Sequence, residues 1–204
     1  MGNERFASLL RGVNVSGHRR VAMAELRELH LGLGLADVET YRQSGNVVFT
    51  ADSTPERLSA AIERAVMERL GHGDVDVLVR RADELQAVVG GNPFLRAGAD
   101  PSTVHVTFLK DPPAHEIPVL DAGRFAPDSF EIAERAVYVH CPAGYARTKL
   151  DNGFFERLTE VRATTRNWAT VTALAGLTAG APARPRGSLG ARRPACRPGG
   201  QAGR

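Results

Sequence analysis

The fold is decided by residues 8–50, which read SLLRGVNVSGHRRVAMAELRELHLGLGLADVETYRQSGNVVFT. The largely apolar run Arg5 to Leu10, which leads into this stretch, predicts a short β-strand. After a loop that contains two glycines, apolar residues recur at helical spacing and predict a helix over Ala22 to Leu33. The stretch therefore begins as a strand, a loop and a helix.

A hairpin completes this stretch, and a second helix and a fourth strand follow it. Strands are predicted at Val38 to Arg42 and Val47 to Thr50, on either side of the turn residues Ser44-Gly45-Asn46. Thr54-Pro55 predicts the start of a second helix, and Asp74 to Val79 alternates as a fourth strand. The resulting order, β-α-β-β-α-β, is that of the ferredoxin-like arrangement.

The rest of the chain repeats this order in a weaker form. We predict an α+β protein of two ferredoxin-like halves in tandem, the second degraded at its end, followed by a C-terminal helix and a disordered tail. The predicted division is residues 1–80 for the first half, 81–179 for the second half with its linking and C-terminal helices, and 180–204 for the tail. The elements predicted after residue 80 are a linking helix (Ala82 to Val89), a strand (Thr103 to Leu109), a poor helix (His115 to Leu120), a hairpin (Ser129 to Ala133 and Val137 to Cys141), a helix (Leu150 to Val161), a vestigial strand (Arg162 to Thr164) and a helix with Trp168 in the core (Asn167 to Leu177).

The net charge of +3 comes from the tail. Six arginines and no acidic residue follow Gly180, so the body holds the remaining 20 basic residues against 23 acidic ones. The tail is rich in Ala, Pro, Arg and Gly and has too few apolar side chains to offset the entropy of ordering it. A body with a negative balance is not typical of a general nucleic-acid binder, so nucleic acid is expected as a partner only through the tail.

The composition also bears on location. No apolar run approaches the roughly 20 residues that a membrane span needs, and no signal-peptide pattern opens the sequence. Cys141 and Cys196 are too few to suggest a disulfide framework. We expect a cytoplasmic protein with no membrane partner. The sequence gives no indication of its oligomeric state.

Two polar clusters are predicted to meet at one edge of the first sheet. The first and second strands of a β-α-β-β-α-β unit run in the same direction, because a helix carries the chain back between them. The loop after the first strand, with Arg11, Asn14 and the basic run His18-Arg19-Arg20, therefore lies beside the hairpin with Ser44 and Asn46. The N-terminus of the first helix faces the same edge, and its unpaired N–H groups favour an anion. The alternative is structural: solvated arginines on a turn, and an amide of Asn14 that braces its own loop.

A second polar group comes near the end of the body. Arg147, Lys149 and Arg166 stand at or just before predicted helix N-termini, where a cation is unfavourable by a few tenths of a kcal/mol. A bound anion would offset this cost. The candidate ligand-binding residues are Arg11, Asn14, Ser44, Asn46, Lys149 and Arg166.

Several other chemistries lack their residues. The loop Gly12 to Arg19 has the two glycines of a nucleotide-binding P-loop, but His18 and Arg19 replace the lysine and the metal-binding hydroxyl. No H-E-x-x-H motif and no Cys/His set at zinc spacing is present, and Ser44 is not in a G-x-S-x-G elbow. No cofactor or metal is therefore predicted.

Three blocks of the sequence resemble a known family. They are residues 9–49, the segment FLKDPP at Phe108 to Pro113, and RTKL at residues 147–150 followed by ATTRNWATVTAL at residues 163–174. Together they are similar to the uncharacterised bacterial family DUF1697, over about Arg5 to Leu177. The resemblance implies a duplicated ferredoxin-like architecture, no established activity and no cofactor. The family's polar positions fall on Arg11, Gly12, Asn14, Ser44, Gly45, Asn46, Lys149, Arg166, Asn167 and Trp168, and the chain departs from the pattern at Ser16 and Arg19-Arg20.

These observations favour a binding module for a phosphorylated or other anionic ligand. One alternative is an enzyme that acts on an anionic small molecule, for which only His18 or His72 offers a general base. The other is a structural or interaction protein without a ligand, whose polar blocks hold loops together.

Overall fold

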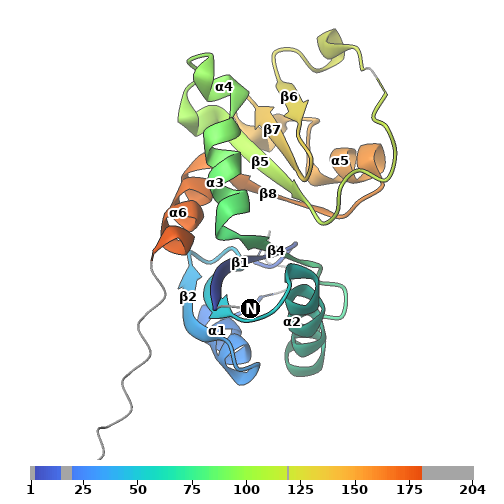
Figure 1. Ribbon diagram of the computed structural model, residues 1–204. Helices are drawn as coiled ribbons and strands as arrows, with labels where there is room; N and C mark the ends of the chain where they lie inside the picture. Colours follow the sequence, from blue (N-terminus) through green and yellow to red (C-terminus); the bar gives the residue numbers. More distant parts are fainter. Residues whose placement is uncertain (1–2, 15–19, 119, 181–204) are drawn as a thin grey trace, which may run out of the picture.

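The computed structural model describes residues 3–14, 20–118 and 120–180. It has two four-stranded antiparallel sheets with helices packed on them, which confirms the α+β class (Figure 1). The tail beyond Gly180 and the loop residues 15–19, with His18 and Arg19, lie outside the described residues. The strands are β1 (Glu4–Leu10), β2 (Ala36–Tyr41), β3 (Asn46–Ala51), β4 (Val77–Arg81), β5 (Val104–Leu109), β6 (Ser129–Ile132), β7 (Ala136–His140) and β8 (Ala163–Asn167), and the α-helices are α1 (Met23–Gly32), α2 (Pro55–Leu70), α3 (Ala82–Gly91), α4 (Pro93–Arg96), α5 (Asn152–Thr159) and α6 (Trp168–Ala179).

The first sheet has the strand order β2-β3-β1-β4. Strands β1 and β2 both pair antiparallel to β3 and so run in the same direction, as predicted. Helices α1 and α2 cover one face, where Leu26, Leu29 and Ile62 pack on Phe6 and Phe49. Helix α2 begins as the sequence indicates, because the Thr54 hydroxyl accepts the Arg57 N–H and Pro55 occupies the first helical position.

The second sheet has the strand order β6-β7-β5-β8, and this half of the structure corrects three predictions. The last strand is not degraded: β8 is five residues long and pairs with β5 along its whole length. The predicted helix His115 to Leu120 is wrong, because the described residues between β5 and β6 hold only a 3-10 turn, η2 (Ala122–Phe125). Helix α5 also starts later than predicted, at Asn152, with the Asp151 carboxylate accepting the Phe154 N–H.

The two sheets share a core that α3 and α6 close along one side (Figure 1). Ala7, Leu9 and Leu78 of the first sheet pack in one cluster with Val106 and Phe108 of the second. Leu85 of α3 and Trp168, Val171 and Leu174 of α6 complete that cluster. Trp168 is therefore a core residue, as predicted.

The sheets correspond to each other strand by strand. In the first, Ala7 of β1 lies opposite Arg80 of β4. In the second, Val106 of β5 lies opposite Arg166 of β8. Arg80 and Arg166 therefore occupy corresponding positions, on the edge strand next to the central strand. Both side chains are buried.

Candidate functional site

A cavity of about 370 Å³ lies where the loop after β1 and the β2–β3 hairpin meet the second sheet. Three of the predicted site residues, Arg11, Ser44 and Arg166, line it together. The predicted convergence of the first loop and the hairpin is therefore present. The second sheet and the first residues of α5 and α6 complete the wall. The remaining lining residues are Leu10, Gly12, Val13, Asn152, Thr164, Thr165, Asn167 and Thr170.

Arg166 connects β8 with the end of β1 and with the β2–β3 hairpin, and we call this region the corner. Its Nε donates to Asn46 Oδ1 at 2.6 Å, and Nη1 donates to Thr164 Oγ1 and to the Thr165 carbonyl. Its Nη2 donates to the carbonyls of Leu10 and Ser44, at 2.9 and 3.2 Å. All five N–H groups of the guanidinium are therefore used by protein oxygens, and none is left for direct contact with a ligand.

The charge of Arg166 has no carboxylate partner among the described residues. The residue is 9% exposed, and this burial lowers the pKa of its guanidinium to about 10, so it stays protonated at neutral pH. Neutral oxygens satisfy its hydrogen bonds without cancelling its charge. The corner therefore holds a net buried positive charge.

Arg11, one of the candidate ligand-binding residues, already pairs with a carboxylate. Its Nε and Nη2 donate to the two carboxylate oxygens of Glu156 on α5, at 2.7 and 2.8 Å. Glu156 Oε1 also accepts the backbone N–H of Ala163 at 2.9 Å. The pair joins the loop after β1 to the second sheet. Arg11 Nη1 has no acceptor among the described residues.

Ser44 and Asn46 have different roles in the hairpin. Asn46 is fully buried, and its Nδ2 donates to Ser44 Oγ and to the Tyr41 carbonyl while Oδ1 receives Arg166. It is a brace behind the cavity wall, whereas Ser44 lines the cavity itself. Gly45 between them has a φ of 68°, and a Cβ there would lie 2.3 Å from Val13 Cγ2. Glycine is therefore required at this turn.

Asn14 braces its own loop. It does not line the cavity. Its Nδ2 donates to the carbonyls of Val21 and Gln43, and its Oδ1 accepts the Val21 N–H at 2.9 Å. The side chain thus ties the loop after β1 to the start of α1 and to the hairpin. This contact set favours the structural alternative for Asn14.

Asn14→Ala is expected to lower the free energy of unfolding by about 1–3 kcal/mol, because three polar groups lose their partner. Asn14 has a φ of 55°, so Asn14→Gly is the matched variant: it removes the same amide but tolerates this backbone conformation. Urea unfolding of both variants separates the amide contribution from the backbone contribution. A loss below about 0.5 kcal/mol in Asn14→Ala would contradict the bracing role.

Lys149 lies apart from the other predicted residues. It lines a separate cavity of about 190 Å³, next to Arg124 and Arg147. It precedes α5 by three residues, and its exposed side chain is not among those that line the first cavity.

Asn152 and Thr165 were not predicted as part of the site. Thr165 Oγ1 donates to Asn152 Oδ1 at 2.6 Å and accepts from Tyr145 at 3.1 Å, and Thr107 Oγ1 lies 2.7 Å away. This network orients the Asn152 amide with its oxygen toward Thr165, which leaves Nδ2 as a donor. Glu156 was missed as well. The sequence offers one indication of its role: Phe155-Glu156-Arg157 on α5 resembles Ile62-Glu63-Arg64 on α2, the helix at the equivalent position in the first half.

Two classes of feature are absent from the described residues. No three His, Cys, Asp or Glu side chains gather there as a metal site requires. No helix in the described ranges has the length and apolar character needed to cross a membrane.

The comparisons with known proteins agree with the resemblance found in the sequence. The family model described as "Protein of unknown function (DUF1697)" matches residues 4–138, which leaves the third sequence block outside the match. The structure is similar to that of the conserved bacterial protein SP0830 from Streptococcus pneumoniae, with a TM-score of 0.67 and 21% sequence identity. That similarity covers 87% of this chain and 99% of the other, and at this identity it shows the fold alone. No curated protein matches the chain.

Proposed function

The chain belongs to DUF1697, a family of proteins of unknown function, and on that premise we propose that it is a binding module for a phosphorylated or other anionic ligand. The ligand would occupy the cavity between the loop after β1, the β2–β3 hairpin and β8. No catalytic step is part of this proposal. His72 does not line the cavity and His18 lies outside the described residues, so neither supports the enzyme alternative as a general base.

The observation that carries the proposal is the buried, uncompensated charge of Arg166. No Asp or Glu is among the residues that line the cavity next to it. At an effective dielectric constant of about 20, an anion 5 Å from the guanidinium is attracted by about 3 kcal/mol. Arg166 thus favours an anion through its charge, although its N–H groups are already used.

Other groups would supply the hydrogen bonds. Arg11 Nη1, Asn152 Nδ2 and the Ser44 hydroxyl belong to residues that line the cavity, and the first two have no described acceptor. Asn152 is the first residue of α5, and Asn167 caps α6, so the N-termini of two helices also border the cavity. Their partial positive charge favours the same sign of ligand.

We also propose the finer description of the fold on which this site rests, in which both halves are ferredoxin-like and divide near residue 80. The shared strand order and the common direction of β1 and β2 support it. In the second half the first helix would be missing, since η2 stands in its place.

A thermal-shift panel of inorganic phosphate, pyrophosphate, nucleotides, sugar phosphates and oligonucleotides tests the proposed function. A ligand at 100 times its dissociation constant adds about 2.7 kcal/mol, which corresponds to a rise of about 5–10 °C in a protein of this size. Arg11→Gln should abolish the shift, because it removes Nη1 from the cavity. Arg27→Gln, on the exposed face of α1, is the control and should retain it.

Two results would contradict the proposal. One is the absence of any shift across the small phosphates. The other is a shift that is the same in Arg11→Gln as in the unmodified chain. A shift with oligonucleotides alone would point instead to the arginine-rich tail.

A further inference from the structure

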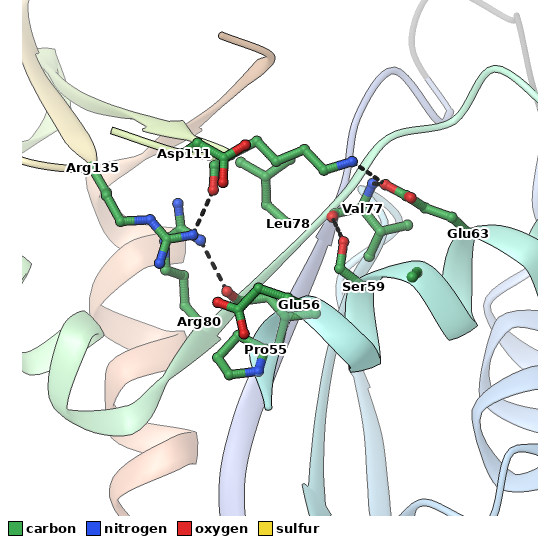
Figure 2. Close-up of a pocket in the computed structure, with 12 residues that line it drawn as sticks. Pro55, Glu56, Ser59, Glu63, Val77, Leu78, Arg80, Asp111 and Arg135 are labelled. Atoms are coloured by element: carbon green, nitrogen blue, oxygen red, sulfur yellow. Dashed lines mark hydrogen bonds and ion pairs between the residues drawn. The ribbon is translucent and has the colours of Figure 1, made fainter. Parts of the chain in front are cut away.

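A cavity of about 170 Å³, the second cavity, is lined by residues from both halves of the chain (Figure 2). It is formed by the first turns of α2, by β4, and by the segments that follow β5 and precede β7. Its wall holds three cationic and three anionic side chains: Arg80, Lys110 and Arg135, with Glu56, Glu63 and Asp111.

This cavity corresponds by internal symmetry to the first one. Leu10 N donates to Gly45 O at 2.9 Å, and Leu109 N donates to Arg135 O at 3.0 Å, so the ends of β1 and β5 match. In the first cavity Arg166 donates to the Leu10 carbonyl, and in the second Arg80 donates to the Leu109 carbonyl. Each arginine thus binds the last carbonyl of the central strand in the other sheet.

The ion pairs beside the two cavities match as well. Arg11 pairs with Glu156 in the first, and Lys110 pairs with Glu63 at 2.6 Å in the second. Glu63 Oε1 accepts the Val77 N–H at 2.9 Å, just as Glu156 Oε1 accepts the Ala163 N–H. The two cavities are therefore bordered by the same arrangement of a buried arginine, an ion pair and a carboxylate that accepts a backbone N–H.

Its chemistry differs in the donors that remain available. Arg166 uses all five N–H groups, whereas Arg80 donates only to the Val79 and Leu109 carbonyls. Its other N–H groups have no acceptor within the described ranges. Arg135, at the position of Gly45, adds a second guanidinium. Its Nη1 donates to Glu84 Oε1 and its Nη2 to the Lys110 carbonyl, while its buried Nε has no partner among the described residues. The second cavity thus has arginine donors free to bind a ligand.

The carboxylates set the charge of that ligand. Lys110 and Glu63 neutralise each other, and Arg135 also pairs at 3.4 Å with Glu84, which lies outside the cavity wall. Within the wall itself, Arg80 and Arg135 lie beside Glu56 and Asp111. Figure 2 shows Glu56 and Asp111 on either side of the two guanidinium groups. A simple anion would be repelled by these carboxylates, and a simple cation would be repelled by the arginines.

We propose that this second cavity binds a small zwitterion of the free amino acid class. Its carboxylate would accept from Arg80 and Arg135, and its ammonium group would donate to Glu56 and Asp111. The cavity is smaller than the roughly 300–1,000 Å³ typical of drug-sized ligands, which suits a molecule of this size. This site is additional to the proposed function and does not depend on an anion in the first cavity.

Calorimetric titration of the full-length chain with the standard amino acids tests this proposal. Propionate and ethylamine serve as matched probes, because each lacks one of the two charges of alanine. At least one amino acid should bind, and its analogue without the ammonium group and its analogue without the carboxylate should each bind at least about tenfold more weakly. Arg135→Gln should weaken binding to a similar extent.

Glu56→Gln is the decisive variant, because Glu56 is exposed and its replacement leaves the core intact. It should weaken amino acid binding about tenfold, whereas Glu28→Gln on the exposed face of α1 should leave it unchanged. Failure of every amino acid to bind at millimolar concentration would overturn the proposal. So would binding of propionate as tight as that of alanine, or binding that Glu56→Gln leaves intact.

Discussion

Arg166→Met is expected to lower the free energy of unfolding by about 3–5 kcal/mol, because several buried oxygens lose their donor at a cost of about 1–3 kcal/mol each, and relief of the buried charge offsets part of the sum. Methionine matches the length of the arginine side chain but donates no hydrogen bond. The substitution leaves Asn46 Oδ1 and the carbonyls of Leu10, Ser44 and Thr165 without this donor. Because Leu10 and Ser44 belong to the first sheet and Arg166 to the second, the contact between the sheets is weakened as well.

Urea unfolding of Arg166→Met and of Arg157→Met measures this effect, since Arg157 is exposed on α5 and should tolerate the same change. Arg166→Lys should fall between them, because an ammonium group keeps the charge but has three donors in place of five. A loss below about 1 kcal/mol in Arg166→Met would show that water replaces the guanidinium without cost.

Lowering the pH from 7 to 4 is expected to remove about 3 kcal/mol of stability through His30 alone. His30 lies fully buried on α1, with Nδ1 donating to the Leu26 carbonyl and Nε2 accepting from the Ser8 hydroxyl. Burial disfavours the charged ring and lowers its pKa from 6.5 to about 4. Between these values the unfolded chain binds a proton that the folded chain does not, so stability falls as the pH falls.

The measurement is the free energy of unfolding from urea melts at several pH values between 7 and 4. His30→Gln should flatten the profile, whereas His115→Gln should not, because His115 is exposed. Burial lowers the pKa of His105 too, which adds a smaller loss of the same sign and leaves some slope in His30→Gln. An unchanged profile in His30→Gln would contradict the assignment.

The first sheet and its helices could be predicted because each element has a recognisable local sequence pattern. Apolar residues at helical spacing mark α1 and α2, and Gly45 between two apolar runs marks the hairpin. Strand β8 has no such pattern, since Thr164, Thr165 and Arg166 are polar residues that the fold buries or places in the wall of the first cavity. Local periodicity therefore underestimates a strand whose side chains form a polar network.

The candidate site could be predicted only where it depends on local sequence patterns. The topology of the first half brings Arg11 and Ser44 together, and that topology follows from local signals. The Arg11–Glu156 pair spans 145 residues, and no spacing rule connects them. Arg166 was predicted as a ligand contact, but its contacts with protein oxygens depend on the position of the second sheet relative to the first, which no local pattern encodes.

The contacts that Arg80 and Arg166 make with the opposite sheets have the pattern of an isologous interface, in which residue i of one copy meets residue j of the other and the reverse. In a homodimer, a residue on the two-fold axis contacts the same residue of the other subunit. Asp76 and Arg162 occupy equivalent positions in the two halves, because the Asp76 carbonyl accepts the Arg11 N–H and the Arg162 carbonyl accepts the Lys110 N–H. Since both copies belong to one chain here, the two positions differ independently, and Arg162 Nε lies 3.5 Å from Asp76 Oδ2. In a symmetric dimer of separate chains, both positions would hold the same residue, and two like charges would repel each other. With both halves in one chain, the two positions can hold opposite charges that attract.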